Sequence, residues 1–337
     1  MATMRDVAKH AGVSVTTVSH YINKTRRVSD ELQMRISAAM EALNYQPNAL
    51  ARSLRRKITH SLGIIIPDSA NPFFAEVARG IEDASFEQDY NVFLCNTDGN
   101  PKKELIYANV LVEKQVDGIL FVASAGTAHD LMRTLAQRKI PLVLVDRDLP
   151  DVEADSVLVN NRLGGYQATR HLIDLGHRRI GCIAGPSDLT PSAERVTGYR
   201  QALAECSIPI DESLIVKGSF HYQSGFEAAQ KLLSLPEPPT AIFACNDLMA
   251  VGAISAAIKS GRSVPGQLSV VGFDDIQLAS YVNPPLTTVA QPTYDVGMLA
   301  AKLLMERLQD RDLPPRRQYL ETQLVIREST AAVGVPA

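Results

Sequence analysis

From residue 60 onward, short apolar runs alternate with longer helical segments, and this alternation constrains the fold more than any other feature of the chain. Strands are predicted at residues 62–67, 91–96, 118–123, 142–146 and 157–160, with helices at 73–86, 103–114 and 130–138. Strands that alternate with helices form a parallel sheet covered by helices. We therefore expect an α/β fold with a doubly wound parallel sheet.

The same alternation begins again at Arg162 and predicts a second, similar lobe. Its expected helices span 162–175, 193–205, 225–233 and 248–259, and its strands span 180–184, 214–217, 241–244 and 268–272. We expect the chain to cross between lobes near 160–161 and again near 286–291. A helix at 295–308 then returns to the first lobe, and 319–327 supplies the final strands. Lobe 1 is thus predicted at about 60–160 and 291–320, and lobe 2 at about 161–290 and 321–330, within a sensor domain of residues 60–337.

The first 46 residues follow a different, all-helical pattern. Thr3 is placed to cap a helix at 4–11, Gly12 suits a left-handed turn, and Ser14 is placed to cap a second helix at 15–22. A short helix, a glycine turn and a second short helix form a helix-turn-helix. Ser29 is expected to cap a third helix at 30–43 that closes the small core.

Charge is divided between the two parts of the chain. Residues 1–59 contain ten Lys or Arg and four Asp or Glu, a formal charge of +6, so the remainder carries −9 of the overall −3. A basic head on an acidic body is typical of a nucleic-acid-binding arm attached to a sensor.

The head resembles the DNA-binding segment of the lactose/galactose-repressor family. The resemblance rests on Asp6-Val7-Ala8, Ala11-Gly12-Val13-Ser14, Thr17-Val18-Ser19 and Asn23. It implies that Val15, Thr16 and His20 read bases in the major groove of double-stranded operator DNA. It also implies phosphate contacts from Ser14, Thr17, Ser19, Lys24, Arg26 and Arg27. Thr3 and Asn23 complete the DNA-binding set predicted for the head.

A segment with the family pattern YxPNxxARSL follows the head, and we expect residues 47–59 to be a hinge helix and linker. NALARSL is too short to be a stable helix alone. In the family this helix orders when a dimer sits on DNA, where Leu54 wedges into the minor groove. By this resemblance the hinge contacts DNA through Asn48, Ala51, Arg52, Leu54 and Arg55.

Ten polar and aromatic residues of the body follow predicted strands, lie at the start of a second-lobe helix or lie at the last crossing, where the cleft of a two-lobed protein is expected. They resemble the ligand site of bacterial ribose-binding proteins. Within the family, head and body look most like the ribose-responsive repressors. The expected effector is D-ribose or a related pentose, with a purine as the alternative. The predicted ligand-binding residues are Asn71, Phe73, Phe74, Asp146, Arg147, Arg195, Phe220, Asn246, Asp274 and Gln291.

Each of these residues also has a structural explanation. Asn71 and Asn246 could cap the following helices, Asp274 could cap a turn, the phenylalanines could be core, and Arg147 could pair with Asp148 at the surface. Ten concurrent matches favour the ligand site.

The sequence lacks the motifs that are typical of several other classes of protein. No HExxH, GxSxG, GxGxxG or P-loop occurs, so we expect no enzyme and no cofactor. The four cysteines are widely spaced and read as reduced structural thiols, not metal ligands. We see no secretory signal or membrane span, which favours a cytoplasmic repressor over a transport-type binding protein. A tail without leucine heptads favours a homodimer over a tetramer.

Overall fold

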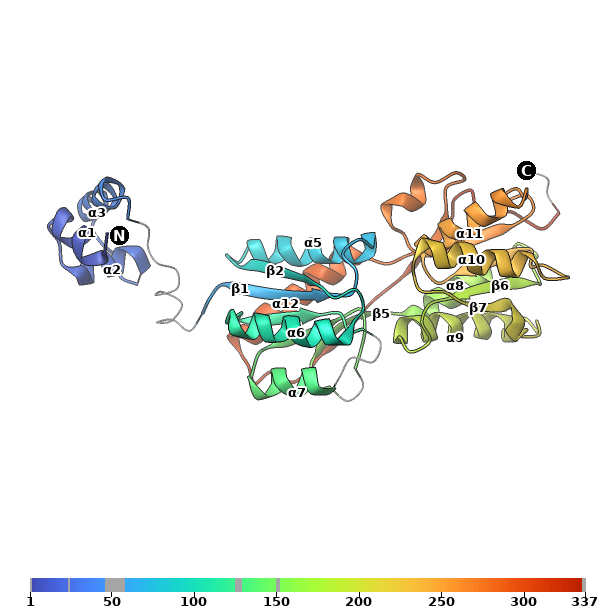
Figure 1. Ribbon diagram of the computed structural model, residues 1–337, viewed down its shortest axis with the longest axis horizontal. Helices are drawn as coiled ribbons and strands as arrows, with labels where there is room; N and C mark the ends of the chain where they lie inside the picture. Colours follow the sequence, from blue (N-terminus) through green and yellow to red (C-terminus); the bar gives the residue numbers. More distant parts are fainter. Residues whose placement is uncertain (1, 24, 46–57, 125–128, 150–151, 335–337) are drawn as a thin grey trace. The chain divides into compact units, whose positions relative to one another are not determined.

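A computed structural model describes residues 2–23, 25–45, 58–124, 129–149 and 152–334 (Figure 1). The chain divides into two compact units, Met1–Thr59 and His60–Ala337, and each is described by itself. We refer to them as the head and the body.

The head contains three helices, α1 (Met4–Ala11), α2 (Val15–Asn23) and α3 (Asp30–Ala42). Thr3 and Asp6 form a capping box at the start of α1, and Gly12 ends that helix at φ 64°, a left-handed conformation that favours glycine. The helices enclose a small core that includes Val7, Val18 and Ile36. The predicted helix-turn-helix is confirmed. Ser29 precedes α3 as expected, but its side chain makes no capping hydrogen bond.

Lobe 1 of the body is a parallel sheet with strand order β11-β5-β4-β3-β1-β2. Its strands are β1 (Ser61–Ile66), β2 (Asn91–Asn96), β3 (Gly118–Phe121), β4 (Leu142–Val145), β5 (Asp155–Val159) and β11 (Arg317–Leu320). Helices α5 (Pro72–Phe86) and α12 (Thr293–Gln309) cover one face, and α6 (Pro101–Glu113) and α7 (His129–Gln137) cover the other. Because both faces are buried, β1 is apolar on both sides: Ile64 packs toward α5 and Ile65 toward α6.

Lobe 2 repeats this architecture with the order β12-β10-β9-β8-β6-β7. Its strands are β6 (Ile180–Ala184), β7 (Ile215–Lys217), β8 (Ala241–Ala244), β9 (Ser269–Asp274), β10 (Thr287–Ala290) and β12 (Gln323–Val325), and only β12 pairs in the antiparallel sense. Its helices are α8 (Asn161–Asp174), α9 (Thr190–Glu205), α10 (Tyr222–Leu233) and α11 (Asp247–Lys259), with short 3₁₀ turns η1 (Glu212–Leu214) and η2 (Gln277–Ser280). The predicted pair of doubly wound lobes is confirmed.

Neighbouring helices of both lobes approach each other through glycines. A Cβ atom on Gly80 of α5 would lie 2.2 Å from the carbonyl oxygen of Tyr294 on α12, and one on Gly297 would lie 2.2 Å from that of Val77. Glycine pairs are used in the same way between α8 and α9 and between α10 and α11 (Gly165, Gly198, Gly225, Gly252). Larger residues there would separate the helices and open the core.

The chain passes between the lobes three times: between β5 and α8, between β10 and α12, and between β11 and β12. The crossing predicted near 286–291 lies at the end of that range, because Thr287–Ala290 pairs with β9 as a strand of lobe 2. The crossing itself begins at Gln291. The final strands were expected at 319–327, and they begin two residues earlier, at Arg317. As the predicted lobe boundaries imply, β11 belongs to the sheet of lobe 1 and β12 to that of lobe 2.

Candidate functional site: a cleft between the lobes and a helix-turn-helix

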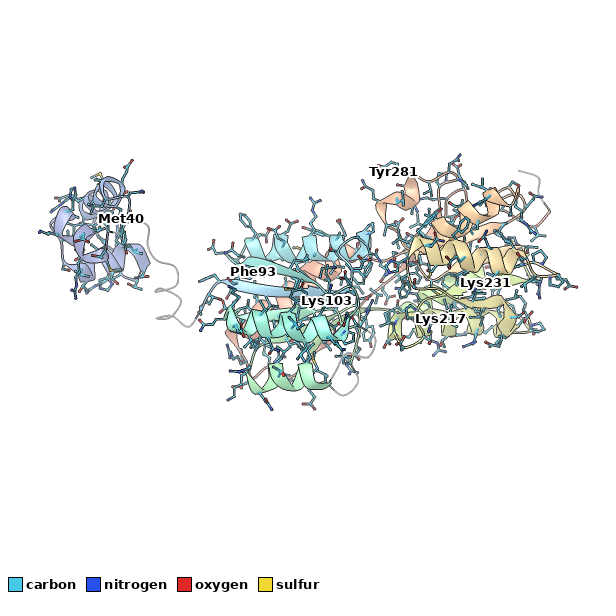
Figure 2. The ribbon with its side chains drawn as sticks, in the orientation of Figure 1. Met40, Phe93, Lys103, Lys217, Lys231 and Tyr281 are labelled. Carbon is cyan, nitrogen blue, oxygen red and sulfur yellow. The ribbon has the colours of Figure 1, made fainter. Side chains whose placement is uncertain are left out.

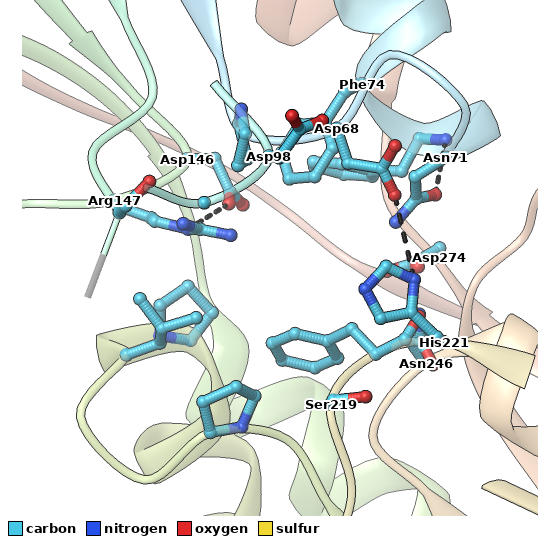
Figure 3. A pocket seen from close by; sticks show the side chains of 18 of the residues that line it. Asp68, Asn71, Phe74, Asp98, Asp146, Arg147, Ser219, His221, Asn246 and Asp274 are labelled. Atoms are coloured by element: carbon cyan, nitrogen blue, oxygen red, sulfur yellow. Dashed lines mark hydrogen bonds and ion pairs between the residues drawn. The ribbon is translucent and has the colours of Figure 1, made fainter. Parts of the chain in front are cut away.

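A pocket of about 290 Å³ is lined by residues of both lobes (Figure 3). Nine of the ten predicted ligand residues line it; Gln291 does not. Of these nine, the lobe 1 residues follow β1 and β4, and those of lobe 2 follow β7 or β8, end β9 or belong to α9. In each sheet the order of strands reverses direction at the first strand of the lobe, and ligands of doubly wound sheets bind at the carboxyl ends near that point. The topology of the two lobes therefore explains why the pocket lies at these strand ends.

Three of the predicted ligand residues in the pocket have a left-handed backbone. Asp146 has φ 64°, Phe220 has φ 65° and Asp274 has φ 120°. Such conformations cost on the order of 1–3 kcal/mol each for residues with a side chain, and they persist where the surrounding structure fixes them. Each of these residues lies at the carboxyl end of a strand or within three residues of it, after β4, after β7 or at the end of β9, and each lines the cleft.

The lobe 1 wall holds a buried carboxylate and guanidinium. Nε of Arg147 lies 3.5 Å from Oδ2 of Asp146, and its Nη1 donates to the carbonyl oxygen of Ala123 at 2.5 Å. The guanidinium also lies 5.6 Å from the ring centre of Phe74. Burial raises the pKa of Asp146 and lowers that of Arg147, while each partner's charge opposes the shift of the other. Arg147 is therefore no surface partner of Asp148.

The lobe 2 wall is built around Arg195. Its Nε donates to Oδ1 of Asn161 at 2.8 Å and its Nη1 to the carbonyl oxygen of Cys245 at 2.6 Å. Nη1 also lies 3.5 Å from Oδ1 of Asp274, and the guanidinium stacks 3.7 Å from the ring centre of Phe273. Burial raises the pKa of Asp274 to about 7, although Arg195 and a hydrogen bond from a glutamine act in the opposite direction.

That glutamine is Gln291, which lies outside the pocket lining. Its Nε2 donates to Oδ1 of Asp274 at 2.7 Å, and its side chain is buried. Gln291 therefore contacts the pocket through Asp274 and is not part of the lining itself, and its role in ligand binding stays a prediction.

The two asparagines of the pocket also cap helices. Oδ1 of Asn71 accepts from the backbone N–H of Phe73 at 3.1 Å, and Oδ1 of Asn246 accepts from that of Met249 at 3.0 Å. Nδ2 of Asn246 donates to the carbonyl oxygen of Phe220, which fixes the strained residue. The capping role and the place in the pocket are compatible.

Sequence reasoning did not predict five further polar residues of the lining: Asp68, Asp98, Ser124, Ser219 and His221. Asp68 of lobe 1 and His221 of lobe 2 face each other, with Oδ2 and Nδ1 3.8 Å apart (Figure 3). Asp98 pairs with Lys103 beside the pocket. These residues lie on irregular loops, and no periodic pattern marks them. Within the ranges that the structure describes, His, Cys, Asp and Glu form no group of three that could hold a metal ion.

The head presents part of its predicted DNA-binding set on its surface. Val15 and Thr16, in the first turn of α2, are exposed. Oγ of Ser14 accepts from the backbone N–H of Thr17 at 3.0 Å and so caps α2. The others are exposed or half-buried: Thr3, Ser19, His20, Asn23 and Arg27.

Two of the half-buried residues have internal partners. Nδ1 of His20 bonds Oγ1 of Thr25 at 2.8 Å, and Nδ2 of Asn23 donates to the carbonyl oxygen of Ser19 at 2.8 Å. Asn23 therefore also stabilises the end of α2. Lys24 and the hinge residues Asn48, Ala51, Arg52, Leu54 and Arg55 lie outside the described residues.

Comparison with known proteins gives matches for both parts of the chain. Residues 3–48 match the model of bacterial regulatory proteins of the lacI family. Residues 59–326 match the model of periplasmic binding proteins and the sugar-binding domain of the LacI family. None of the described helices is long and apolar enough to cross a membrane.

Two curated relatives are similar over almost their whole length. The HTH-type transcriptional repressor PurR of Photobacterium profundum is 43% identical over 330 residues, 98% of each chain. The ribose operon repressor of Escherichia coli K12 is 43% identical over 331 residues, covering 98% of this chain and 100% of the relative.

Solved structures agree with these matches. A LacI family transcriptional regulator from Enterococcus faecium with bound ribose is 30% identical with a TM-score of 0.75, covering 81% of this chain and 99% of the other. The lac repressor dimer bound to operator and the anti-inducer ONPF is 27% identical with a TM-score of 0.88, covering 98% of this chain and 99% of the other. A helix-turn-helix head, a two-lobed body with a polar cleft and these full-length similarities place the chain in the LacI family of ligand-responsive bacterial repressors.

Proposed function

We propose that this repressor senses D-ribose or a closely related pentose in the cleft and that pocket occupancy alters its grip on operator DNA. The observation that carries the proposal is the presence of one buried carboxylate and one buried guanidinium on each wall, Asp146 with Arg147 and Arg195 with Asp274. A polyol presents vicinal hydroxyls, which can donate to carboxylates and accept from guanidinium groups. Aromatic side chains such as Phe74 and Phe220 suit its C–H surface.

The charges of the pocket favour an uncharged ligand. Arg147 and Arg195 each lie beside a carboxylate, and Asp68 and Asp98 add negative charge to the lining. The phosphate group of a sugar phosphate would lie near these carboxylates. Burying negative charges close to one another is unfavourable. The free sugar is therefore the preferred form.

A purine is the second candidate. It is favoured by the relative named PurR, which is as similar to this chain as the relative named ribose operon repressor. The pocket also has aromatic side chains from both lobes, Phe74 and Phe220. The two charged pairs suit a polyol better than a flat base, so ribose comes first.

We propose a homodimer in which each head meets one half-site of a pseudo-palindromic operator. Phe93 and Leu94 on the edge strand β2 are about half exposed, at 47% and 48%, and Tyr281 of lobe 2 is 73% exposed (Figure 2). An edge strand with exposed apolar side chains offers a surface on which another chain can pack. In the head, Val15 and Thr16 supply base contacts, and the hinge follows the phosphates.

Titration of the full-length chain with ribose, other pentoses, hexoses and purines tests the ligand. The same ligands are then added at saturation to the chain bound to a duplex selected from a random library, at fixed salt. We expect micromolar-range binding of ribose and a change in duplex affinity of tenfold or more, about 1.4 kcal/mol of coupling. Unchanged duplex affinity with ribose would exclude it as effector, and a response to a purine alone would establish the second candidate.

A further inference from the structure

Asp247, the first residue of α11, is a fully buried carboxylate that lies outside the pocket lining. Both of its oxygens accept hydrogen bonds, Oδ1 from Oγ1 of Thr288 at 2.5 Å and Oδ2 from the backbone N–H of Ile276 at 2.9 Å. A Cβ atom on Gly272 of β9 would lie 2.2 Å from Oδ1. The space for this carboxylate exists because β9 carries glycine at that position.

The three segments that Asp247 joins all reach the pocket or its support. Asn246, which precedes it, lines the pocket. Ile276 follows Asp274, the last residue of β9, and Asp275, whose φ values of 120° and 59° are both left-handed. The strand containing Thr288 leads directly to Gln291, the donor to Asp274. Asp247 therefore holds in place the segments of Ile276 and Thr288, which together determine where the Asp274 carboxylate lies.

The same contacts reach lobe 1. Ile276 is buried in the apolar cluster of lobe 1 that contains Phe73 and Phe74, and Leu248, the residue after Asp247, packs against that cluster. The hydrogen bond from Ile276 to Asp247 thus fixes a lobe 2 loop whose side chain belongs to the core beside the pocket.

This arrangement is costly for a carboxylate. Burial, and then the negative charge of Asp274, raise the pKa of Asp247, while its two hydrogen bonds act in the opposite direction. An apolar residue would avoid the cost but would leave the backbone N–H of Ile276 without its acceptor.

We propose that Asp247 is a positioning residue for the effector: by holding Ile276 and Thr288 it fixes the Asp274 carboxylate in the cleft, so ligand affinity depends on a side chain outside the pocket. The role of the cleft as a ligand site is taken from the proposed function. Replacement by alanine releases the strained Asp274–Asp275 turn. Replacement by asparagine retains an acceptor for Ile276 and a hydrogen-bonding group for Thr288.

The first test measures binding of D-ribose to full-length Asp247→Ala and Asp247→Asn by calorimetry. Asp155→Ala is the matched control, because Asp155 is also fully buried and is bonded by Arg307 and Arg316 at the amino end of β5. We expect at least a tenfold loss for Asp247→Ala, at most a threefold loss for Asp247→Asn, and unchanged affinity for Asp155→Ala despite lower thermal stability. Binding by folded Asp247→Ala within threefold of wild type would overturn the proposal.

The second test needs no ligand. In the chain labelled with ¹⁵N-arginine, the Nε–Hε resonance of Arg195 reports the placement of Asp274, 3.5 Å from its guanidinium. This resonance should shift in Asp247→Ala and stay in place in Asp155→Ala; an unshifted resonance in Asp247→Ala would overturn the proposal. If wild type bound neither pentose nor purine, the proposed function would fail while this measurement still decided the role of Asp247.

Discussion

Nη1 of Arg195 lies 3.5 Å from Oδ1 of Asp274, and both side chains are almost fully buried in the lobe 2 wall of the pocket. The guanidinium reaches Asn161, Cys245 and Asp274 at once, which a lysine ammonium cannot do with the same geometry.

Arg195→Lys should therefore weaken ribose binding about tenfold to a hundredfold, as expected for the loss of one charge-assisted hydrogen bond of about 1.5–3 kcal/mol. Calorimetry on the full-length chain measures this change. Arg200→Lys is the control, because Arg200 lies on the same helix but pairs with Glu212 at the surface. Equal ribose affinities for Arg195→Lys and Arg200→Lys would show that Arg195 does not contribute to ligand binding.

Gly185→Ala should weaken ribose binding about tenfold without altering the charged groups. A Cβ atom at this position would lie 2.2 Å from Cζ of Phe220, so the ring must move within the pocket at an overpacking cost of about 1–3 kcal/mol. Gly261→Ala serves as control. That glycine has φ 77° and open space around it, so the variant should lose stability and keep ribose affinity. Wild-type affinity for Gly185→Ala would show that the Phe220 ring does not contact ligand.

Asp274→Asn should alter stability in a pH-dependent manner. Because burial raises the pKa of Asp274 from 3.8 to about 7, the fold prefers the protonated carboxyl; that contribution is full below pH 3.8 and is lost as pH rises to about 7. Asparagine mimics the neutral acid at every pH. The Tm difference between Asp274→Asn and wild type should therefore shift in favour of asparagine between pH 5 and pH 8, measured without ligand. A difference that is the same at both pH values, or one that Asp275→Asn reproduces, would contradict this cause.

Arg35→Ala should weaken operator binding and leave ribose affinity unchanged. Arg35 on α3 donates to the carbonyl oxygen of Ala11 from Nε at 3.1 Å and from Nη2 at 2.7 Å, which ties α3 to the turn of the helix-turn-helix. Without it a carbonyl loses its partners at a cost of about 1–3 kcal/mol, a large share of the stability of a small head. Anisotropy with a selected duplex measures the effect, and Glu41→Ala, on an exposed position of α3, is the control. Normal duplex binding by Arg35→Ala would show that this contact does not organise the head.

The periodic parts of the fold were predictable from sequence. The buried strands of both lobes are continuous apolar runs. Capping residues at Thr3, Ser14 and Asn71 mark the starts of the helices that follow them. Thr287–Ala290 was not among the predicted strands, because a short run with two threonines carries no clear pattern. Its place in the sheet depends on pairing with β9, which is a tertiary contact.

For the site, the sequence predicted the residues directly after strands, since strand ends in a doubly wound lobe meet at one edge. It could not place Gln291, whose direction depends on where the crossing turns. Nor could it predict that Asp68 and His221, 153 positions apart, face each other, because that depends on how the two lobes meet. The contacts of Asp247 could not be predicted for the same reason, because its partners Ile276 and Thr288 come from separate segments of the chain.

The three passages between the lobes have a consequence for synthesis of the chain. The sheet of lobe 1 receives α12 and its last strand, β11, only from residues 293–320, after nearly all of lobe 2 has been made. Until then Val143 and Val157 lack the cover of Leu304, so a nascent chain on the ribosome carries an open apolar face. Lobe 1 can therefore complete its sheet and its apolar core only after the ribosome has synthesised residues 293–320.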